Sequence, residues 1–236
     1  MVAVIGDVHG CFYTLQNLVE KIRAKYPDIK IYCVGDLVDR GNYSLEVIDY
    51  VLSESIEFTK GNHDLMFYAF YRDPNTSMAK NWIQNGAATT IESYINNVEK
   101  RDEHLNVIYN APLFINTVDC FISHAGISKF YQKYLKEYFL NDLVSLKNLL
   151  ESDLFENHSV IWCRQNLMNI GKLQIVGHTH RKDTFYDHES NTVYLDTTAF
   201  GLNKLTAAII ENSKVIEMIE QPTFKDDSDS RWKYYL

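Results

Sequence analysis

Five predicted strands of this chain end directly before a loop that carries acid, amide or histidine side chains, and four of these loops begin with glycine. The loops read GDVHG, GDLVDRG, GNHD, SHAG and GHTH, at residues 6–10, 35–41, 61–64, 123–126 and 177–180. In open α/β sheets, ligands bind beyond the carboxyl ends of the strands. The polar side chains of the five loops are therefore expected to converge on one site.

The first quarter of the chain alternates strands and helices. Segments 1–5, 29–34 and 56–59 are short and apolar, which is typical of buried strands. Apolar residues recur at helical spacing over 11–26 and again over 43–52, so a helix is predicted between each pair of strands. This βαβαβ order predicts an α/β fold with a parallel sheet and right-handed crossovers.

The remainder of the chain predicts a helical middle followed by further strands. Helices are expected at 65–71 and 78–97, and others of less certain extent between residues 129 and 166. Strands are expected at 113–117, 120–123, 173–176, 192–195, 207–211 and 214–219. We expect a single domain over residues 1–220 that contains a helical, cap-like segment at about 64–110. Residues 221–236 then form a C-terminal tail without clear periodicity.

Length and charge exclude several classes of protein. A chain of 236 residues fits one large domain better than two small ones. Its net charge of -8 argues against a dedicated binder of nucleic-acid polymers, which needs clustered Lys and Arg. The four cysteines form no CxxC pair, no apolar run is long enough for a membrane span, and no signal peptide is recognisable. These features favour a cytoplasmic protein.

The five loops supply nitrogen and oxygen ligands for metals. A mixed set of imidazole and carboxylate groups suits Mn, Fe or Zn better than Ca or Mg, which prefer oxygen alone. No thiolates are clustered as a structural zinc site requires. The alternative is a set of hydrogen-bonded loop residues in a nucleotide-binding sheet, which would require five separate coincidences of position.

The motifs GDVHG, GDLVDRG, GNHD, SHAGI and GHTH resemble the motif series of the calcineurin-like metallophosphoesterases. Their order and the DRG element are similar to the phosphoprotein phosphatase family, in its compact bacterial serine/threonine phosphatase-like form. The resemblance runs from Asp7 to about Glu211. It implies a two-sheet β-sandwich flanked by helices. It also implies two divalent metal ions, with Mn²⁺ expected first and Fe or Zn as alternatives.

The resemblance also implies the metal ligands. Asp7 and His9 would bind one ion, and Asp36 would bridge both, with a hydroxide between them as the nucleophile. The second ion would be completed by three residues that lie far apart in the chain, namely Asn62, His124 and His178. In more distant metallophosphoesterases with a GHxH motif, the second histidine binds the first metal. His180 is therefore a further expected ligand, and a loop histidine facing solvent is the alternative.

The remaining site residues are expected to handle the substrate. By resemblance, His63 would protonate the leaving oxygen, oriented by Asp39, since histidine can donate a proton near neutral pH. Arg40 would grip the phosphate, together with Asn62. The segment IWCR at 161–164 resembles a later Trp-x-Arg element of the family, which makes Arg164 the expected second clamp. The family commonly has GNHE, and the shorter Asp64 found here is expected to support the ligands indirectly.

Two readings of the substrate remain open. Segment 81–94 resembles a stretch shared by bacterial protein phosphatases and dinucleoside tetraphosphate hydrolases. It either covers the core as an amphipathic helix or forms a cap that selects the substrate. In symmetrical dinucleoside tetraphosphate hydrolases the corresponding motif resembles GDLVARG, which lacks the acid that supports the catalytic histidine. This chain keeps that acid as Asp39. The difference favours phosphomonoesters such as phosphoserine or phosphothreonine in a protein or peptide.

The alternatives are a dinucleoside polyphosphate such as diadenosine tetraphosphate, another small phosphoester, or an inactive, metal-free binding scaffold. Such a scaffold is expected to have lost ligands or the acid histidine, and here every position is filled. No nucleic-acid polymer and no membrane is expected as a partner.

Overall fold

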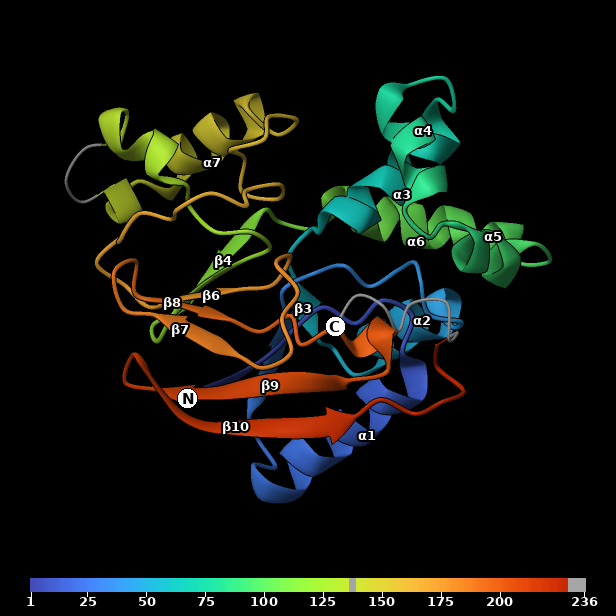
Figure 1. Cartoon of the computed structure of the whole chain (residues 1–236), viewed down its shortest axis with the longest axis horizontal. Helices are drawn as coiled ribbons and strands as arrows, with labels where there is room; N and C mark the ends of the chain where they lie inside the picture. The colour runs from blue at the N-terminus through green and yellow to red at the C-terminus, as the bar shows by residue number, and fades with distance from the viewer. Residues whose placement is uncertain (136–138, 229–236) are drawn as a thin grey trace.

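A computed structural model describes residues 1–135 and 139–228 of the chain, and it contains two five-stranded sheets. The first sheet has the strand order β10-β9-β1-β2-β3 and the second has the order β4-β5-β6-β8-β7. Figure 1 shows the second sheet above the first. The strands of the first sheet are β1 Val2–Ile5, β2 Lys30–Cys33, β3 Glu57–Phe58, β9 Lys204–Glu211 and β10 Lys214–Pro222. Those of the second are β4 Phe114–Asn116, β5 Phe121–Ser123, β6 Gln174–Val176, β7 Phe185–Asp187 and β8 Thr192–Tyr194.

The described helices lie outside these two sheets (Figure 1). The longer ones are α1 Phe12–Lys25, α2 Ser44–Ser53, α3 Asn62–Arg72, α4 Ser77–Gln84, α5 Ala88–Tyr94, α6 Val98–Asn110 and α7 Leu143–Ser152. Short 3-10 helices occupy Lys129–Lys133, Phe139–Asn141 and Ala199–Gly201.

The predicted parallel core is confirmed, and antiparallel strands extend it. Strands β1, β2 and β3 are parallel, while β9 and β10 add to the edge beside β1 in antiparallel register. In the second sheet β5, β6 and β8 are parallel, and β4 and β7 are antiparallel edges. Strand β7 was not predicted, because its two aromatic residues, Phe185 and Tyr186, are both exposed and form no buried apolar run.

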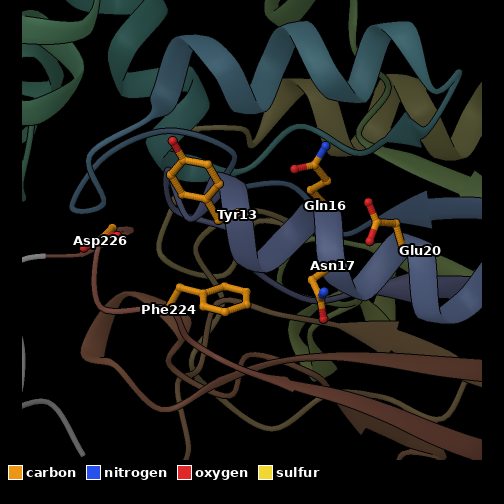
Figure 2. Close-up of a pocket in the computed structure, with 6 residues that line it drawn as sticks. All are labelled: Tyr13, Gln16, Asn17, Glu20, Phe224 and Asp226. Carbon is orange, nitrogen blue, oxygen red and sulfur yellow. The ribbon is translucent and has the colours of Figure 1, made fainter.

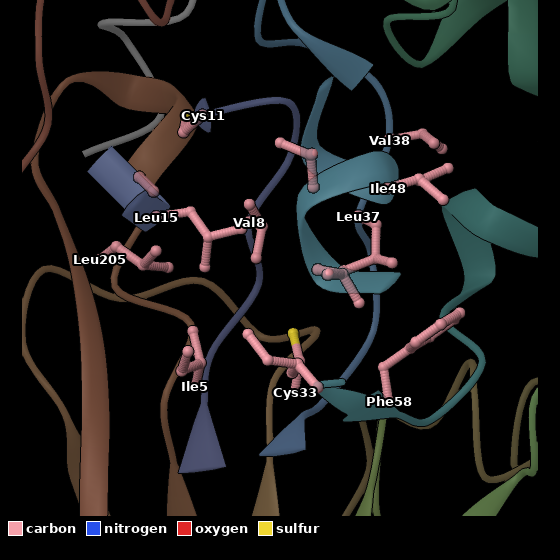
Figure 3. Close-up of a cluster of buried hydrophobic side chains, with 14 of the residues drawn as sticks. Ile5, Val8, Cys11, Leu15, Cys33, Leu37, Val38, Ile48, Phe58 and Leu205 are labelled. Carbon is pink, nitrogen blue, oxygen red and sulfur yellow. The ribbon is translucent and has the colours of Figure 1, made fainter. Parts of the chain in front are cut away.

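Two apolar layers explain the sandwich. Along β1, Val2 and Val4 point into a cluster shared with Ile122 and Ile175 of the second sheet. The alternate residues of a strand face the opposite side, where Ile5 packs with the apolar face of α1 (Figure 3). The first sheet is therefore buried on both faces, which is why β1 reads as a continuous apolar run. The expected two-sheet β-sandwich flanked by helices is confirmed.

The predicted cap-like segment at 64–110 is helical, but its boundaries differ. The helix predicted over 78–97 is two helices, α4 and α5, because Gly86 adopts φ 106° between them. Helix α6 was not predicted. Aromatic rings hold the segment together: the Phe67 ring lies 5.5 Å from Trp82 and 5.4 Å from Tyr94, centroid to centroid. Below, the helices α3–α6 are called the cap segment.

The predicted boundary at residue 220 falls inside β10, which continues to Pro222. Beyond it, the buried carboxylate of Asp227 accepts hydrogen bonds from the backbone N–H groups of Tyr13 (2.9 Å) and Thr14 (2.7 Å). Residues 223–228 thus pack against the start of α1, and the predicted tail from 229 onward lies outside the described residues. None of the helices in the described ranges is long and apolar enough to cross a membrane.

A surface pocket of about 310 Å³ lies beside this contact (Figure 2). It is lined by six residues of α1 and the segment after β10, namely Tyr13, Gln16, Asn17, Glu20, Phe224 and Asp226. None of them belongs to the five polar loops, so the candidate site lies elsewhere.

Candidate active site

The five polar loops meet at the carboxyl ends of strands from both sheets. Residues 6–10 follow β1 and residues 35–41 follow β2, while 61–64 lead from β3 into α3. The other two loops follow β5 and β6 of the second sheet. The side chains that they bring together are more than nine-tenths buried, namely those of Asp7, His9, Asp36, Asn62, His63, His124 and His178.

Asp36 lies at the centre of this group. Its Oδ2 atom is 3.5 Å from Nε2 of His9 and 3.4 Å from Nε2 of His124. Two sets of three residues each place a ligand atom within 4.8 Å of the others, and Asp36 belongs to both: with His9 and His63, and with Asp7 and His124. The first set includes His63, which was predicted as the proton donor, and the second joins Asp7 to His124, which were predicted for different ions. The bridging role of Asp36 stays a prediction.

The imidazole rings are held with one nitrogen turned to the centre. His9 donates from Nδ1 to the carbonyl oxygen of Val38 (2.9 Å), and His124 donates from Nδ1 to that of Val34 (3.0 Å). A carbonyl oxygen only accepts, so these bonds fix the proton on Nδ1. The lone pair on Nε2 of each ring then faces Asp36. Backbone partners of this kind are typical of metal-binding histidines.

The side-chain oxygen of Asn62 faces two histidine nitrogens, at the place predicted for the second metal ion. Its Oδ1 atom faces Nε2 of His124 at 2.9 Å and Nδ1 of His178 at 2.8 Å. His178 donates from Nε2 to the carbonyl oxygen of Trp162 (3.2 Å), so its Nδ1 also carries a lone pair. Burial lowers the pKa of His178 and lowers that of His124 to about 4, which keeps both rings neutral. Three acceptor atoms thus face one another, an arrangement that a cation would satisfy.

The buried carboxylates also fit a positive charge. Burial raises the pKa of Asp36 to about 7, and burial together with the nearby Asp196 and Asp36 raises that of Asp7. Both groups lose hydration and repel one another when ionised. A divalent ion would stabilise the ionised forms of both. The donor set therefore fits two divalent metal ions.

We expect Mn²⁺ to stabilise the metal-free protein against heat. An ion that binds only the folded state contributes about 2.7 kcal/mol when present at a hundred times its Kd. For a chain of this size that corresponds to a rise in Tm of roughly 5–10 °C. Differential scanning fluorimetry measures it, with sodium chloride at matched ionic strength as the control. An equal shift with both salts would contradict a specific site.

Several site residues adopt left-handed backbone conformations that non-glycine residues rarely populate. The φ angles are 46° for His9, 51° for Asp36, 62° for His178 and 70° for Arg40. Such strain persists only where surrounding contacts determine the conformation, and it concentrates at functional sites. The left-handed backbone conformations therefore serve to direct these side chains toward the site.

Asp64 supplies one of these contacts. Its carboxylate accepts hydrogen bonds from the backbone N–H groups of Asp36 (2.9 Å), Leu37 (2.9 Å) and Gly61 (3.0 Å). The side chain is fully buried. Asp64 thus ties the loop of Asp36 to the loop of Asn62, which is the indirect support that the sequence predicted for it.

The glycines that begin two of the loops are explained by close approach. A Cβ atom on Gly61 would collide with Oδ1 of Asp36, and one on Gly177 would collide with Oδ1 of Asp7. Each of these glycines lets its loop pass directly against a carboxylate supplied by another loop. Glycine at the strand end is therefore a packing requirement of the site.

His63 is paired with Asp39 as the resemblance implied. Nδ1 of His63 lies 2.6 Å from Oδ2 of Asp39. The cap segment holds the same carboxylate through Trp82, whose Nε1–H donates to both oxygens at 2.8 and 2.9 Å, and through the Thr90 hydroxyl at 2.8 Å. Burial raises the pKa of Asp39 and lowers that of His63. Four donor and acceptor contacts thus fix the dyad in one orientation.

Arg40 points into the centre of the group. Its Nη1 donates to Nε2 of His9 (2.8 Å) and its Nη2 donates to Nε2 of His63 (2.9 Å). The guanidinium carbon lies 4.3 Å from the centroid of the Phe200 ring, a cation–π contact. The sequence analysis did not identify Phe200, because an aromatic residue in an irregular segment gives no periodic signal.

Two predicted site residues are placed less closely. Arg164 is exposed, and its charge contributes to the lowered pKa values of His124 and His178. His180 is half-buried, with its ring centroid 6.3 Å from that of Phe200. It belongs to neither of the close three-residue sets among the described residues. The phosphate-binding role of Arg164 and the metal-binding role of His180 stay predictions.

The sequence analysis also missed Asp196. This carboxylate is buried, raises the pKa of Asp7 and of Asp36, and acts against the lowering of the His180 pKa by burial. It therefore belongs to the acidic centre. Asp196 follows β8 after one residue, so the strand-end pattern was present, but no glycine marked it.

Comparisons with known proteins agree with this geometry. A sequence profile of the calcineurin-like phosphoesterases matches residues 1–195. The asymmetrical bis(5′-nucleosyl)-tetraphosphatase PrpE of Anoxybacillus flavithermus is 30% identical over 228 residues, covering 86% of this chain and 88% of its own. The symmetrical bis(5′-nucleosyl)-tetraphosphatase of Erwinia tasmaniensis is 31% identical over 131 residues, covering 53% of this chain and 44% of its own.

A solved structure of a candidate diadenosine tetraphosphatase superposes with a TM-score of 0.61 at 16% identity. The match covers 95% of this chain and 94% of the other. At this identity the likeness concerns the fold. Together with the profile, which spans most of the sequence, it assigns the chain: the protein belongs to the calcineurin-like phosphoesterase family.

Proposed function

We propose that this phosphoesterase hydrolyses dinucleoside tetraphosphates such as diadenosine tetraphosphate, and that it cuts them asymmetrically. The observation that carries the proposal is the match with the Anoxybacillus flavithermus PrpE protein, which covers 86% of this chain. The symmetrical relatives of Erwinia tasmaniensis and Psychromonas ingrahamii match over 53% and 67% of this chain. Asp39 also distinguishes this chain from the symmetrical enzymes, whose motif at this position resembles GDLVARG.

Six side chains would hold two divalent ions, namely those of Asp7, His9, Asp36, Asn62, His124 and His178. Bound there, two such ions would lower the pKa of a water molecule and neutralise charge on the phosphoryl oxygens. Mn²⁺ is proposed first, with Fe or Zn as alternatives, because the donors are nitrogen and oxygen atoms. A cytoplasmic location is also proposed, supported by four buried, free cysteine thiols.

Two side chains of the protein would act on the substrate: Arg40 would bind the phosphate, and His63 would protonate the leaving oxygen. Arg40 carries a planar fork of donors that matches two phosphate oxygens, and it already lies against His9 and His63. His63, with Nδ1 bonded to Asp39, presents Nε2 to the same space. In this structure Nε2 accepts a hydrogen bond from Arg40, so His63 would give a proton to the oxygen that leaves phosphorus once Nε2 is protonated and Arg40 has turned to the phosphate.

The second candidate function is hydrolysis of phosphomonoesters such as phosphoserine or phosphothreonine in a peptide. The 2.6 Å contact between His63 and Asp39 favours it. An alcohol leaves as a strongly basic alkoxide unless it is protonated, whereas the nucleotide that leaves a phosphoanhydride is a weak base. An oriented general acid therefore gives a larger advantage with a phosphomonoester.

Product analysis separates these functions. Mn²⁺-loaded protein is expected to convert diadenosine tetraphosphate into equal amounts of ATP and AMP, with a higher kcat/KM than for a phosphopeptide. Chromatography of the nucleotides measures the ratio, and an Asp36→Asn preparation controls for contaminating hydrolases. Formation of ADP alone would contradict the asymmetrical cut. A higher kcat/KM for the phosphopeptide would favour the second candidate function.

A further inference from the structure

A second pocket, of about 400 Å³, opens between the cap segment and the chain after α7. In Figure 1 the cap segment and α7 both stand at the same end of the two sheets. The pocket lining includes Ser77, Met78, Asn81, Phe155, Asn157 and Trp162, and none of its lining side chains is charged. Small-molecule sites typically measure roughly 300–1,000 Å³, so the pocket is large enough for a heteroaromatic ring.

One wall of this pocket is continuous with the active site. Trp162 accepts the Nε2–H of His178 at its carbonyl oxygen (3.2 Å), and its ring centroid lies 6.3 Å from that of His178. Arg164, the predicted phosphate clamp, follows two residues later. A ligand that stacks on Trp162 would therefore place an attached phosphate beside the predicted metal ligands.

The opposite wall also leads to the active site. Asn81 lines the pocket, and the next residue, Trp82, donates its indole N–H to Asp39. The partly buried Met78 side chain packs against the core around α1 and against the core under α7. The pocket thus lies at the seam between these two cores, bounded on both sides by segments that position catalytic groups.

The lining chemistry matches a nucleobase. Trp162 and Phe155 offer aromatic faces, and stacking on a base is favourable for any of the bases. The side-chain amides of Asn81 and Asn157 make no hydrogen bond to another residue in the described ranges. Each amide both donates and accepts, as the edge of a purine requires. A phosphate or a charged peptide side chain would find no counter-charge there.

We propose that this pocket binds the nucleobase of the nucleoside next to the scissile phosphate, and that it selects nucleotides over phosphopeptides. The inference rests on the proposed function and names the specificity site that this function requires. The base stacks on Trp162 and bonds with Asn81 and Asn157, while the phosphate chain extends past Arg164 toward Arg40.

Two substitutions test the pocket without touching the metal ligands. Phe155 is 71% exposed, so Phe155→Ala leaves the core intact. Asn81→Leu keeps the side-chain size and removes the amide. Each is expected to raise KM for diadenosine tetraphosphate by roughly fivefold to tenfold in Mn²⁺-loaded protein, with a much smaller change in kcat. With p-nitrophenyl phosphate, which has no base, the loss should be smaller. Tyr134→Ala, an exposed aromatic outside the pocket, is the matched control.

The outcomes separate this inference from the proposed function. If the wild-type protein hydrolyses diadenosine tetraphosphate and both pocket variants retain its KM, the inference is overturned and the function stands. If the wild-type protein does not hydrolyse it, the function fails. Competition then decides the inference: AMP should inhibit p-nitrophenyl phosphate hydrolysis at least about fivefold better than ribose 5-phosphate, which lacks only the base. Equal inhibition by the two compounds would overturn it.

Discussion

Replacing the carboxylate of Asp36 by an amide (Asp36→Asn) is expected to reduce kcat/KM by roughly a thousandfold or more, which corresponds to about 4 kcal/mol or more. Asp36 is the one residue shared by both close ligand sets among the described residues, and its Oδ2 atom lies near a histidine of each predicted metal. An amide offers one oxygen and no charge. The variant should therefore bind fewer than two ions, as inductively coupled plasma mass spectrometry would measure.

The matched control is Asp49→Asn. Asp49 is a partly exposed carboxylate that pairs with Lys100 and His104 on the helices outside the site. Its loss removes the same charge and should leave two ions bound and kcat/KM within about twofold, because surface ion pairs contribute little. Two tightly bound ions in an active Asp36→Asn protein would refute the bridging assignment.

The sheets could be predicted from the sequence where the local pattern was strong. The mostly apolar runs that form β1, β2 and β6 are largely buried and are followed by glycine. The apolar pattern and the glycine after it therefore predict the same strand end. β7 could not be predicted, because Phe185 and Tyr186 are exposed and the strand forms by pairing with β8. Pairing of that kind depends on tertiary structure and leaves no mark in a single short segment.

The candidate site shows the same division. Residues in the five loops could be recognised because each loop carries acid, amide or histidine groups at a strand end, and four of the loops begin with a glycine. Trp82, Thr90 and Phe200 could not be assigned roles, since nothing local in their sequence reveals that they contact Asp39 or Arg40. These contacts join residues more than forty positions apart. The contacts of Trp82 and Thr90 exist only after the cap segment packs against the loop of Asp39, and that of Phe200 only after the segment following β8 packs against Arg40.

Substitution of His63 is expected to separate metal binding from proton donation. His63→Asn should retain both ions, because Nδ1 of His63 is bonded to Asp39 and Nε2 to Arg40, leaving the predicted ligand set intact. Its kcat should fall by about 10²–10⁴-fold with a phosphomonoester of a simple alcohol. With p-nitrophenyl phosphate the loss should be smaller, since that leaving group needs little protonation. Single-turnover kinetics over a series of leaving groups measures the difference.

The cap segment supplies an independent check on the same step. Trp82→Phe keeps an aromatic ring among Phe67 and Phe70 but removes the N–H that bonds both oxygens of Asp39. A less firmly held Asp39 should orient His63 less well, so kcat should fall with the same dependence on leaving group, at unchanged metal content. Tyr94→Phe removes another buried hydrogen bond of the cap segment, from the hydroxyl to His104, without touching His63 or Asp39, and is the matched control.

Diadenosine tetraphosphate expels a weakly basic nucleotide. The loss of kcat with this substrate in both His63→Asn and Trp82→Phe should therefore resemble the loss with p-nitrophenyl phosphate. Equal losses across all leaving groups would show that His63 does not act as the general acid.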